Sequence, residues 1–178
     1  TNHQAMDSVR GVEKQLVIND TNVEGSDENA LTSFNSDGFT IGSRTAINTT
    51  GDSYVAWCWD AGSSTVSNSD GSITSSVRSN PAYGFSVVTY TGNGTSGATI
   101  GHGLGGVAPS MVIVKERNST GNWITYHKYA AATAENGYLS LNETSAFTTN
   151  LASWNNTAPT GSVFTLGNGA DVNASGIN

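Results

Sequence analysis

Short β-rich runs separated by turn residues recur along the whole chain. Val, Ile, Thr and aromatic residues dominate these runs, which cover 14–18, 38–41, 53–59, 84–90, 110–115, 122–127, 137–141 and 162–166. Between them stand turn sequences, including NSDG at 35–38 and again at 68–71. Runs of strand length between residues that accept positive φ are typical of antiparallel hairpins. We therefore expect an all-β fold, an antiparallel β-sandwich of the jelly-roll or immunoglobulin-like kind.

The composition excludes several classes of partner. The chain has 178 residues and a net charge of −7, with only seven Lys and Arg residues, so we expect no nucleic acid as partner. No apolar run approaches the roughly 20 residues of a membrane span, so we expect no membrane insertion. Cys58 is the only cysteine, which rules out an internal disulfide and a multi-cysteine metal site.

An internal repeat sets the domain organisation. GFTIGSRTAINTTG at 38–51 aligns without a gap with VFTLGNGADVNASG at 163–176, and LVINDT at 16–21 matches LSLNET at 139–144. Two matches in the same order indicate two copies of one unit. We expect the back part of a first unit over 1–60, a Ser-rich hairpin or linker over 61–82 and a second unit over 83–178, packed as one globular unit.

The repeat also predicts a strand that the second unit lacks. In the first copy the aligned sequence is followed by YVAWCW, whereas in the second copy the given sequence stops one or two residues into that position. A sandwich without this strand exposes unpaired backbone groups. Three explanations are open. The first copy's own strand folds back into the gap, or the strand was lost by truncation and the fragment is prone to aggregate. The third, which we favour, is that a neighbouring subunit donates a strand. The candidate assembly residues are Tyr54, Val55, Trp57, Cys58, Trp59, Leu16 and Ile18.

The same run also predicts part of the core. With the period of two of a strand, both faces of YVAWCW are largely apolar, which favours a strand between two layers. A platform for stacking on sugars is the alternative, because it uses exposed Trp side chains. The remaining interior is expected at Val87, Val112, Ile113, Val114, Leu139, Leu141, Phe164 and Leu166, with Trp57 or Cys58 beside them.

Several stretches resemble a known kind of repeat. DSVRG, LTSFNSDGFTIGS, VAWCWDAG, GFSVVTYTGNGTSGATIGHGLGGVAPSMVIVK and VFTLGNGADVNASG are similar to a repeat in uncharacterised β-rich proteins of aquatic bacteriophages and environmental metagenomes. Those proteins are often long, tail-fibre-like and built of tandem copies. The resemblance implies a fibrous protein, extracellular or on the virion surface, with no activity to carry over.

Motifs that suggest chemistry lack the context that chemistry needs. GHGLGG at 101–106 fits the glycine pattern of dinucleotide sites, but a proline and a strand-like run follow it where a helix is required. His102 and His127, even with Glu116 or Asp171, form no metal or nucleophile motif. We therefore expect no enzyme, no cofactor and no metal.

Two further expectations concern sugars. Sequons start at Asn19, Asn48, Asn142 and Asn173, in equivalent positions of the two copies, and they are glycosylation candidates. The function that we expect is a non-enzymatic subunit of a fibre or filament that binds itself head to tail. The alternative is a lectin-like module that binds glycans through exposed Trp123 and Trp154.

Overall fold

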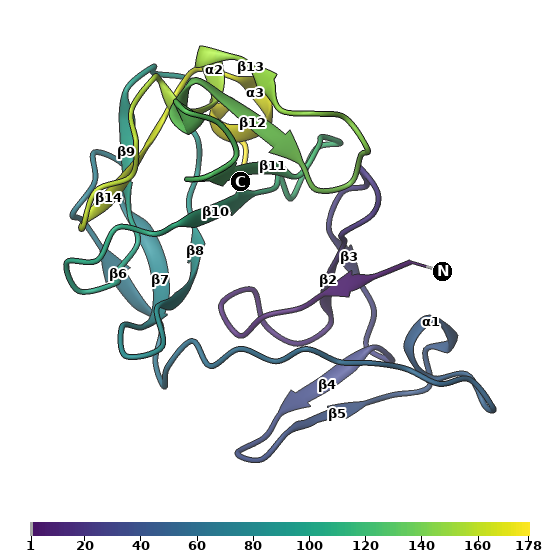
Figure 1. The fold of residues 1–178 in the computed structure, drawn as a ribbon. Coiled ribbons are helices and arrows are strands. Elements are labelled where there is room, and N and C mark those ends of the chain that lie inside the picture. Colours follow the sequence, from purple (N-terminus) through teal and green to yellow (C-terminus); the bar gives the residue numbers. More distant parts are fainter. Residues whose placement is uncertain (1) are drawn as a thin grey trace.

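Short antiparallel strands make up most of the regular secondary structure (Figure 1). The computed structural model describes residues 2–178. The strands are β1 (Gln4–Ala5), β2 (Lys14–Val17), β3 (Gly25–Ser26), β4 (Leu31–Phe34), β5 (Phe39–Ile41), β6 (Val66–Asn68), β7 (Ser75–Asn80), β8 (Phe85–Thr89), β9 (Ala98–Gly101), β10 (Met111–Val114), β11 (Ile124–His127), β12 (Gly137–Ser140), β13 (Thr148–Thr149) and β14 (Val163–Leu166). One-turn helices α1 (Thr45–Asn48), α2 (Leu151–Trp154) and α3 (Ala170–Asn173) and the 3-10 turn η1 (Ala134–Asn136) complete the fold. The prediction of a mainly β fold is confirmed.

The strands form small sheets of two to four members. Their orders are β1-β2-β3, β4-β5, β6-β7-β8, β9-β14 and β10-β11-β12-β13. Most pairs join neighbours in the sequence, whereas β9 and β14 join distant parts of the second unit. Within the Ser-rich stretch β6 and β7 form a hairpin, with Val66 opposite Val77 and Asn68 opposite Ser75.

Seven of the eight predicted strand runs contain a strand, and the eighth does not. Residues 53–59 lie outside every sheet, and Figure 1 shows them as part of the long stretch without an arrow between α1 and β6. The prediction of a strand there is wrong. A strand is defined by backbone pairing with a neighbour, and no strand of the described residues offers its edge to this run.

The main core lies in the second unit. Nine buried residues form it. Four of them, Trp154, Ile100, Ile124 and Leu166, are at most 2 % exposed, and the other five are Val114, Tyr126, Ala134, Phe164 and Val172. Val88 of β8, Tyr90 directly after β8 and Val112 of β10 pack against this core. Both strands therefore contribute to one apolar interior.

The predicted core residues are partly right. Val114, Phe164 and Leu166 are buried, Val112 packs against them, and Val87 and Leu139 are partly buried. Ile113 and Leu141 are exposed, at 42 % and 44 %, so their assignment was wrong. Because side chains alternate along β10, Val112 and Val114 face the core and Ile113 faces away from it. Leu141 follows the last residue of β12 and points out of the core.

The two repeat copies share one local structure. We call residues 38–51 the first motif and residues 163–176 the second motif. Helices α1 and α3 occupy aligned positions, and the aligned glycines Gly51 and Gly176 have φ angles of 89° and 77°. Gly42 N–H donates to Ala30 O at 2.7 Å, and its counterpart Gly167 N–H donates to Ser153 O at 2.8 Å. The internal repeat in the sequence is therefore a repeat of backbone geometry as well.

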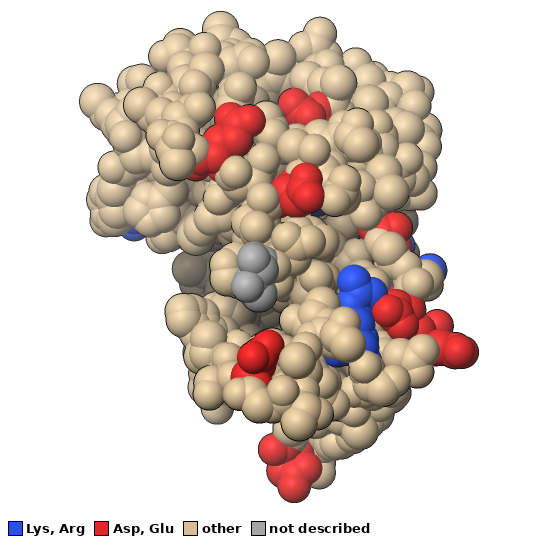
Figure 2. All heavy atoms as spheres, turned by 90° about the vertical axis from the view of Figure 1, so that its right-hand side faces the viewer, with Lys and Arg blue, Asp and Glu red and all other residues tan. Residues whose placement is uncertain are grey.

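The surface carries few charges. Figure 2 shows one face on which acidic and basic side chains are scattered over a mostly uncharged surface. No helix of residues 2–178 is both long enough and apolar enough to cross a membrane.

Candidate assembly surface

The most unusual surface of the chain is its aromatic segment, which we define as residues 53–59. All seven residues are exposed, and Val55, Trp57 and Trp59 reach 78 %, 66 % and 65 %. Cys58 is exposed as well, not the buried small side chain that the sequence suggested. The prediction that this run packs inside a sandwich is wrong, because no second layer covers either of its faces in the described residues. The large apolar side chains of this segment are therefore exposed to solvent.

The aromatic segment contacts the rest of the protein near each of its two ends. Tyr54 Oη accepts a hydrogen bond from Thr49 N–H at 2.9 Å. The ring of Trp59 stacks on Phe85, with ring centroids 6.0 Å apart and an interplanar angle of 21°. Within the segment no backbone N–H or C=O has a hydrogen-bond partner among residues 2–178. Its backbone is therefore free to pair with another strand.

Two strand edges in the second unit are also free. Within the described residues, β8 pairs only with β7 and β10 pairs only with β11, although both strands pack on the same core. Residues beyond their ends meet the last residues of the chain: Gly92 N–H donates to Ile177 O at 2.8 Å, and Arg117 N–H donates to Asn178 O at 2.6 Å. A strand that starts at this point and runs back would be antiparallel to both β8 and β10.

The other predicted donor is already paired. Leu16 lies in β2, which pairs with β1 on one edge and β3 on the other, and it is only 5 % exposed. Ile18 follows β2, and its N–H donates to His3 O at 2.8 Å. Neither residue belongs to a free strand, so the structure leaves the aromatic segment as the candidate donor.

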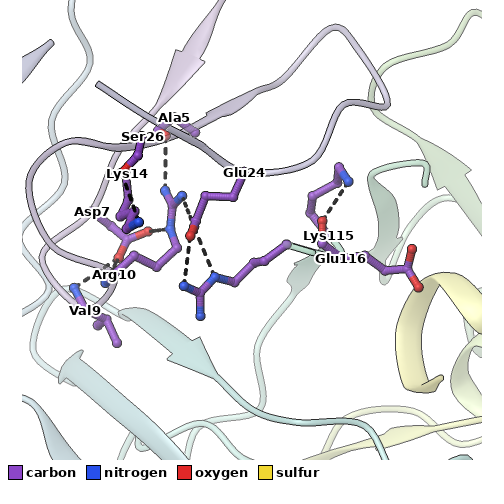
Figure 3. Close-up of polar contacts among 10 residues, drawn as sticks. Ala5, Asp7, Val9, Arg10, Lys14, Glu24, Ser26, Lys115 and Glu116 are labelled. Carbon is purple, nitrogen blue, oxygen red and sulfur yellow. Dashed lines mark hydrogen bonds and ion pairs between the residues drawn. The ribbon is translucent and has the colours of Figure 1, made fainter. Parts of the chain in front are cut away.

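A buried ion network joins the two units (Figure 3). Glu24, between β2 and β3, accepts hydrogen bonds from Arg10 in the first unit at 3.0 Å and from Arg117 in the second at 2.9 and 3.0 Å. Arg10 also binds Asp7 and donates to Ala5 O. Burial disfavours the charged carboxylate, but hydrogen bonds and charges from the two arginines outweigh it and lower the pKa of Glu24. The network fixes the first unit against the end of β10.

Glu116 lies next to this network but does not join it. Figure 3 shows its carboxylate pointing away from Arg10 and Glu24. Burial, reinforced by the charge of Asp171, raises the pKa of Glu116. In residues 2–178 no group of three or more His, Cys, Asp or Glu side chains is arranged to hold a metal ion.

Both histidines singled out in the sequence have structural contacts. His102 is 2 % exposed, with Nε2 3.0 Å from Thr160 O and Nδ1 accepting from Leu104 N–H. His127 Nδ1 accepts from Tyr129 N–H at 3.3 Å. The GHGLGG sequence starts at Gly101, the last residue of β9, and continues into the loop before β10, with Gly103, Gly105 and Gly106 at positive φ.

The tryptophans proposed for sugar binding are inside the protein. Trp123 is 7 % exposed and its Nε1–H donates to Val17 O at 2.9 Å, so it links the two units. Trp154 is 1 % exposed and packs edge-on against Tyr126. The prediction that these rings are exposed is wrong, because each fills a core that the spacing of nearby apolar residues did not reveal.

The sequon asparagines differ in exposure. Asn19 and Asn48 are exposed and Asn142 is half-buried. Asn173 is 1 % exposed and its side chain is fully hydrogen-bonded, so the folded protein does not present it for modification.

The whole chain matches one protein family. The family model covers residues 1–177. The chain belongs to DUF7483, a domain of unknown function. The DUF7483 match includes both motifs and the aromatic segment between them. No curated protein and no solved structure matches the chain.

Proposed function

We propose that this chain is a non-enzymatic structural module that joins copies of itself into a fibre by β-strand addition. The observation that carries the proposal is the aromatic segment, an extended apolar run with a free backbone. Such a segment gains main-chain hydrogen bonds and buries its side chains when it pairs with the edge of another sheet. The similarity of the sequence to tail-fibre-like repeats supports a place outside the cell or on a virion.

The acceptor in this proposal is the seam between the free edges of β8 and β10. In the repeat alignment Gly51 corresponds to Gly176, so Ser53 corresponds to Asn178 at the mouth of that seam. The aromatic segment follows the first motif directly, and the equivalent place after the second motif is the seam. A strand in this place would join the two small sheets into one continuous antiparallel sheet and complete the sandwich that the sequence predicts.

Donation between copies has a consequence for assembly. The donor and the acceptor are different surfaces, so one copy uses its segment on a second copy and still offers its own seam to a third. Such a heterologous contact does not close on itself unless its rotation permits a ring, and it propagates into a filament. An assembly of this kind needs no partner other than the chain itself.

The test is sedimentation velocity over a range of protein concentrations, with negative-stain microscopy of the largest species. We expect the wild type to form concentration-dependent oligomers. Trp57→Ser removes a large central contact worth roughly 2 kcal/mol, which corresponds to about a 30-fold weaker association. Tyr129→Ser is the matched control, because Tyr129 is 77 % exposed but lies outside the segment. A wild type that stays monomeric at high concentration contradicts the proposal.

Glycan binding is the second candidate, and one observation favours it. Trp57 and Trp59 are two residues apart on an extended chain and both rings are exposed, which is an arrangement suited to stacking on sugar rings. A glycan array with wild type and Trp57→Ser distinguishes the two functions. Binding of a defined glycan by monomeric protein, lost in the variant, supports the lectin-like function.

A further inference from the structure

The two motifs have the same backbone but different surroundings. Phe39 of the first motif aligns with Phe164 of the second; Phe39 is 40 % exposed and Phe164 is 5 % exposed. Asn48 aligns with Asn173, and the former is exposed whereas the latter is 1 % exposed. Residues of the same type in the same local structure are thus covered in one copy and uncovered in the other.

One of the stretches that cover the second motif is residues 84–101. Its strand β9 pairs with β14, which places Ile100 opposite Phe164. The ring of Tyr90 meets Phe164 edge-on at 6.4 Å between centroids, and its hydroxyl donates to Val172 O at 2.7 Å. We call residues 84–101 the front segment.

The loop of the front segment also recognises the asparagine of the second motif. Asn93 N–H donates to Asn173 Oδ1 at 2.9 Å, and Asn173 Nδ2 donates to Thr95 O at 2.9 Å. Gly94 N–H donates to the backbone oxygen of Asn173 at 2.8 Å. Gly92 lies so close to the backbone of Asn173 and Ala174 that a Cβ atom has no room there. These contacts make the front segment complementary to the second motif in shape and in hydrogen bonding.

The first motif presents the same edge without a partner. In the second motif His102 N–H donates to Ser162 O, so by alternation Ser162, Phe164 and Leu166 face β9. In the first motif Asn35 N–H donates to Gly38 O, so by the same alternation Gly38 and Thr40 face β4. The backbone of Phe39 therefore faces the other edge of β5. This edge of β5 is the counterpart of the edge of β14 that pairs with β9. Within residues 2–178 no strand pairs with it.

We infer that the first motif is a docking site for a front segment, the 84–101 stretch of another copy of the repeat. The partner is inferred from the contacts that the front segment already makes with the second motif. By alignment, a front segment docked on the first motif would pair its β9 strand with β5 and donate its Tyr90 hydroxyl to the carbonyl of Ile47. Its Asn-Gly turn would hydrogen-bond to the side chain of Asn48. Ile47 and Asn48 are the aligned counterparts of Val172 and Asn173. Tyr54 of the aromatic segment touches Thr49 of the first motif, but the docking residues Phe39, Ile47 and Asn48 lie outside residues 53–59. The test of this inference therefore does not depend on strand donation by the aromatic segment.

A labelled peptide of residues 84–104 tests the inference by fluorescence anisotropy against the full chain. We expect saturable binding that Phe39→Asp weakens at least 10-fold and that Trp57→Ser leaves unchanged. Val23→Asp is the matched control, since Val23 is 46 % exposed and lies outside the first motif. Replacing Ile100 by Asp in the peptide should weaken binding as Phe39→Asp does. Binding that Phe39→Asp does not affect overturns the inference.

A fused chain removes the question of whether the free peptide reaches its bound conformation. Residues 84–124 are placed directly before residue 1, which makes the docking intramolecular and raises the effective concentration of the segment. Phe39→Asp should then lower the melting temperature of the fused chain clearly, while it changes that of the original chain little. Equal effects of Phe39→Asp in the two chains, or no rise in melting temperature on fusion, overturn the inference.

Discussion

Asn48 and Asn173 make the same hydrogen bond in the two repeat copies. Each donates from Nδ2 to the backbone oxygen of a glycine six residues earlier, Gly42 at 2.8 Å and Gly167 at 2.9 Å. The bond closes the one-turn helix against the strand that precedes it, which explains why an asparagine stands at both places. Beyond this bond the two residues differ, because only Asn173 is covered by a second segment of the chain.

The two asparagines should therefore contribute unequally to stability. Asn173→Ala leaves the N–H of Asn93 and the oxygens of Thr95 and Gly167 without their side-chain partners in a buried place, which should cost roughly 2–3 kcal/mol. Asn48→Ala loses one exposed hydrogen bond and should cost less than about 1 kcal/mol. Urea denaturation of both variants measures the difference. Equal losses would show that the front segment does not stabilise the second motif.

Ile113 and Ile124 provide a matched pair for the orientation of the sheet of β10 and β11. Ile113 is 42 % exposed and Ile124 is 2 % exposed. Ile113→Asp should change the free energy of unfolding by no more than about 1 kcal/mol, because its carboxylate stays in water. Ile124→Asp buries an unpaired charge and should cost several kcal/mol, enough to unfold a domain of ordinary stability. Circular dichroism melts of the two variants test this, and the reverse order would place the wrong face of the sheet inside.

The local pattern of the sequence predicted most strands correctly. The runs now seen as β2, β5, β8, β10, β11, β12 and β14 contain Val, Ile, Thr and aromatic residues between turn residues, and the hairpin of β6 and β7 turns at NSDG. These features act over a few residues. The internal repeat was also visible, because a shared sequence gives a shared backbone in α1 and α3.

What the sequence did not reveal depends on contacts between distant segments. Trp57 lies in a run with a strong strand pattern, but among residues 2–178 no strand pairs with this run. Trp154 and Phe34 end similar runs, LASW and LTSF, yet the first forms a helix with a buried ring and the second a strand with a 45 % exposed ring. The sequence pattern predicts apolar side chains, whereas the neighbouring segments decide which of them are covered.

The ion network of Glu24 predicts an acid-sensitive junction between the units. The pKa of Glu24 is lower in the folded protein, so the network stabilises fully above the ordinary glutamate pKa of about 4.3 and loses this contribution as pH falls through the lower folded value. Glu24→Gln should cost roughly 1–3 kcal/mol at pH 7, because Arg10 and Arg117 lose a charged acceptor. Melting curves from pH 7 to 3 should show the two proteins converging in acid. A constant difference would contradict the role of ionised Glu24.

The seam between β8 and β10 can be filled from within one chain. Appending the sequence of residues 54–60 directly after Asn178 supplies a strand in the register that the repeat alignment gives. We expect this extended protein to be monomeric where the wild type associates, and to melt at a higher temperature, since its new strand buries the edges of both sheets. As a control, the same extension with Ser in place of the copied Trp57 and Trp59 should suppress association less and raise the melting temperature less. Unchanged association of the extended protein would show that the seam is not the acceptor.

Hydrogen exchange of residues 53–59 tests the central claim most directly. In dilute protein their backbone N–H groups have no partner among the described residues, so they should exchange at nearly the rate of an unfolded peptide. In concentrated, assembled protein the account predicts that successive amides of this segment, which point in turn to β8 and to β10, become protected by at least 10-fold, together with the free edges of β8 and β10. An assembly in which residues 53–59 exchange as fast as in the dilute protein would contradict strand donation by the aromatic segment.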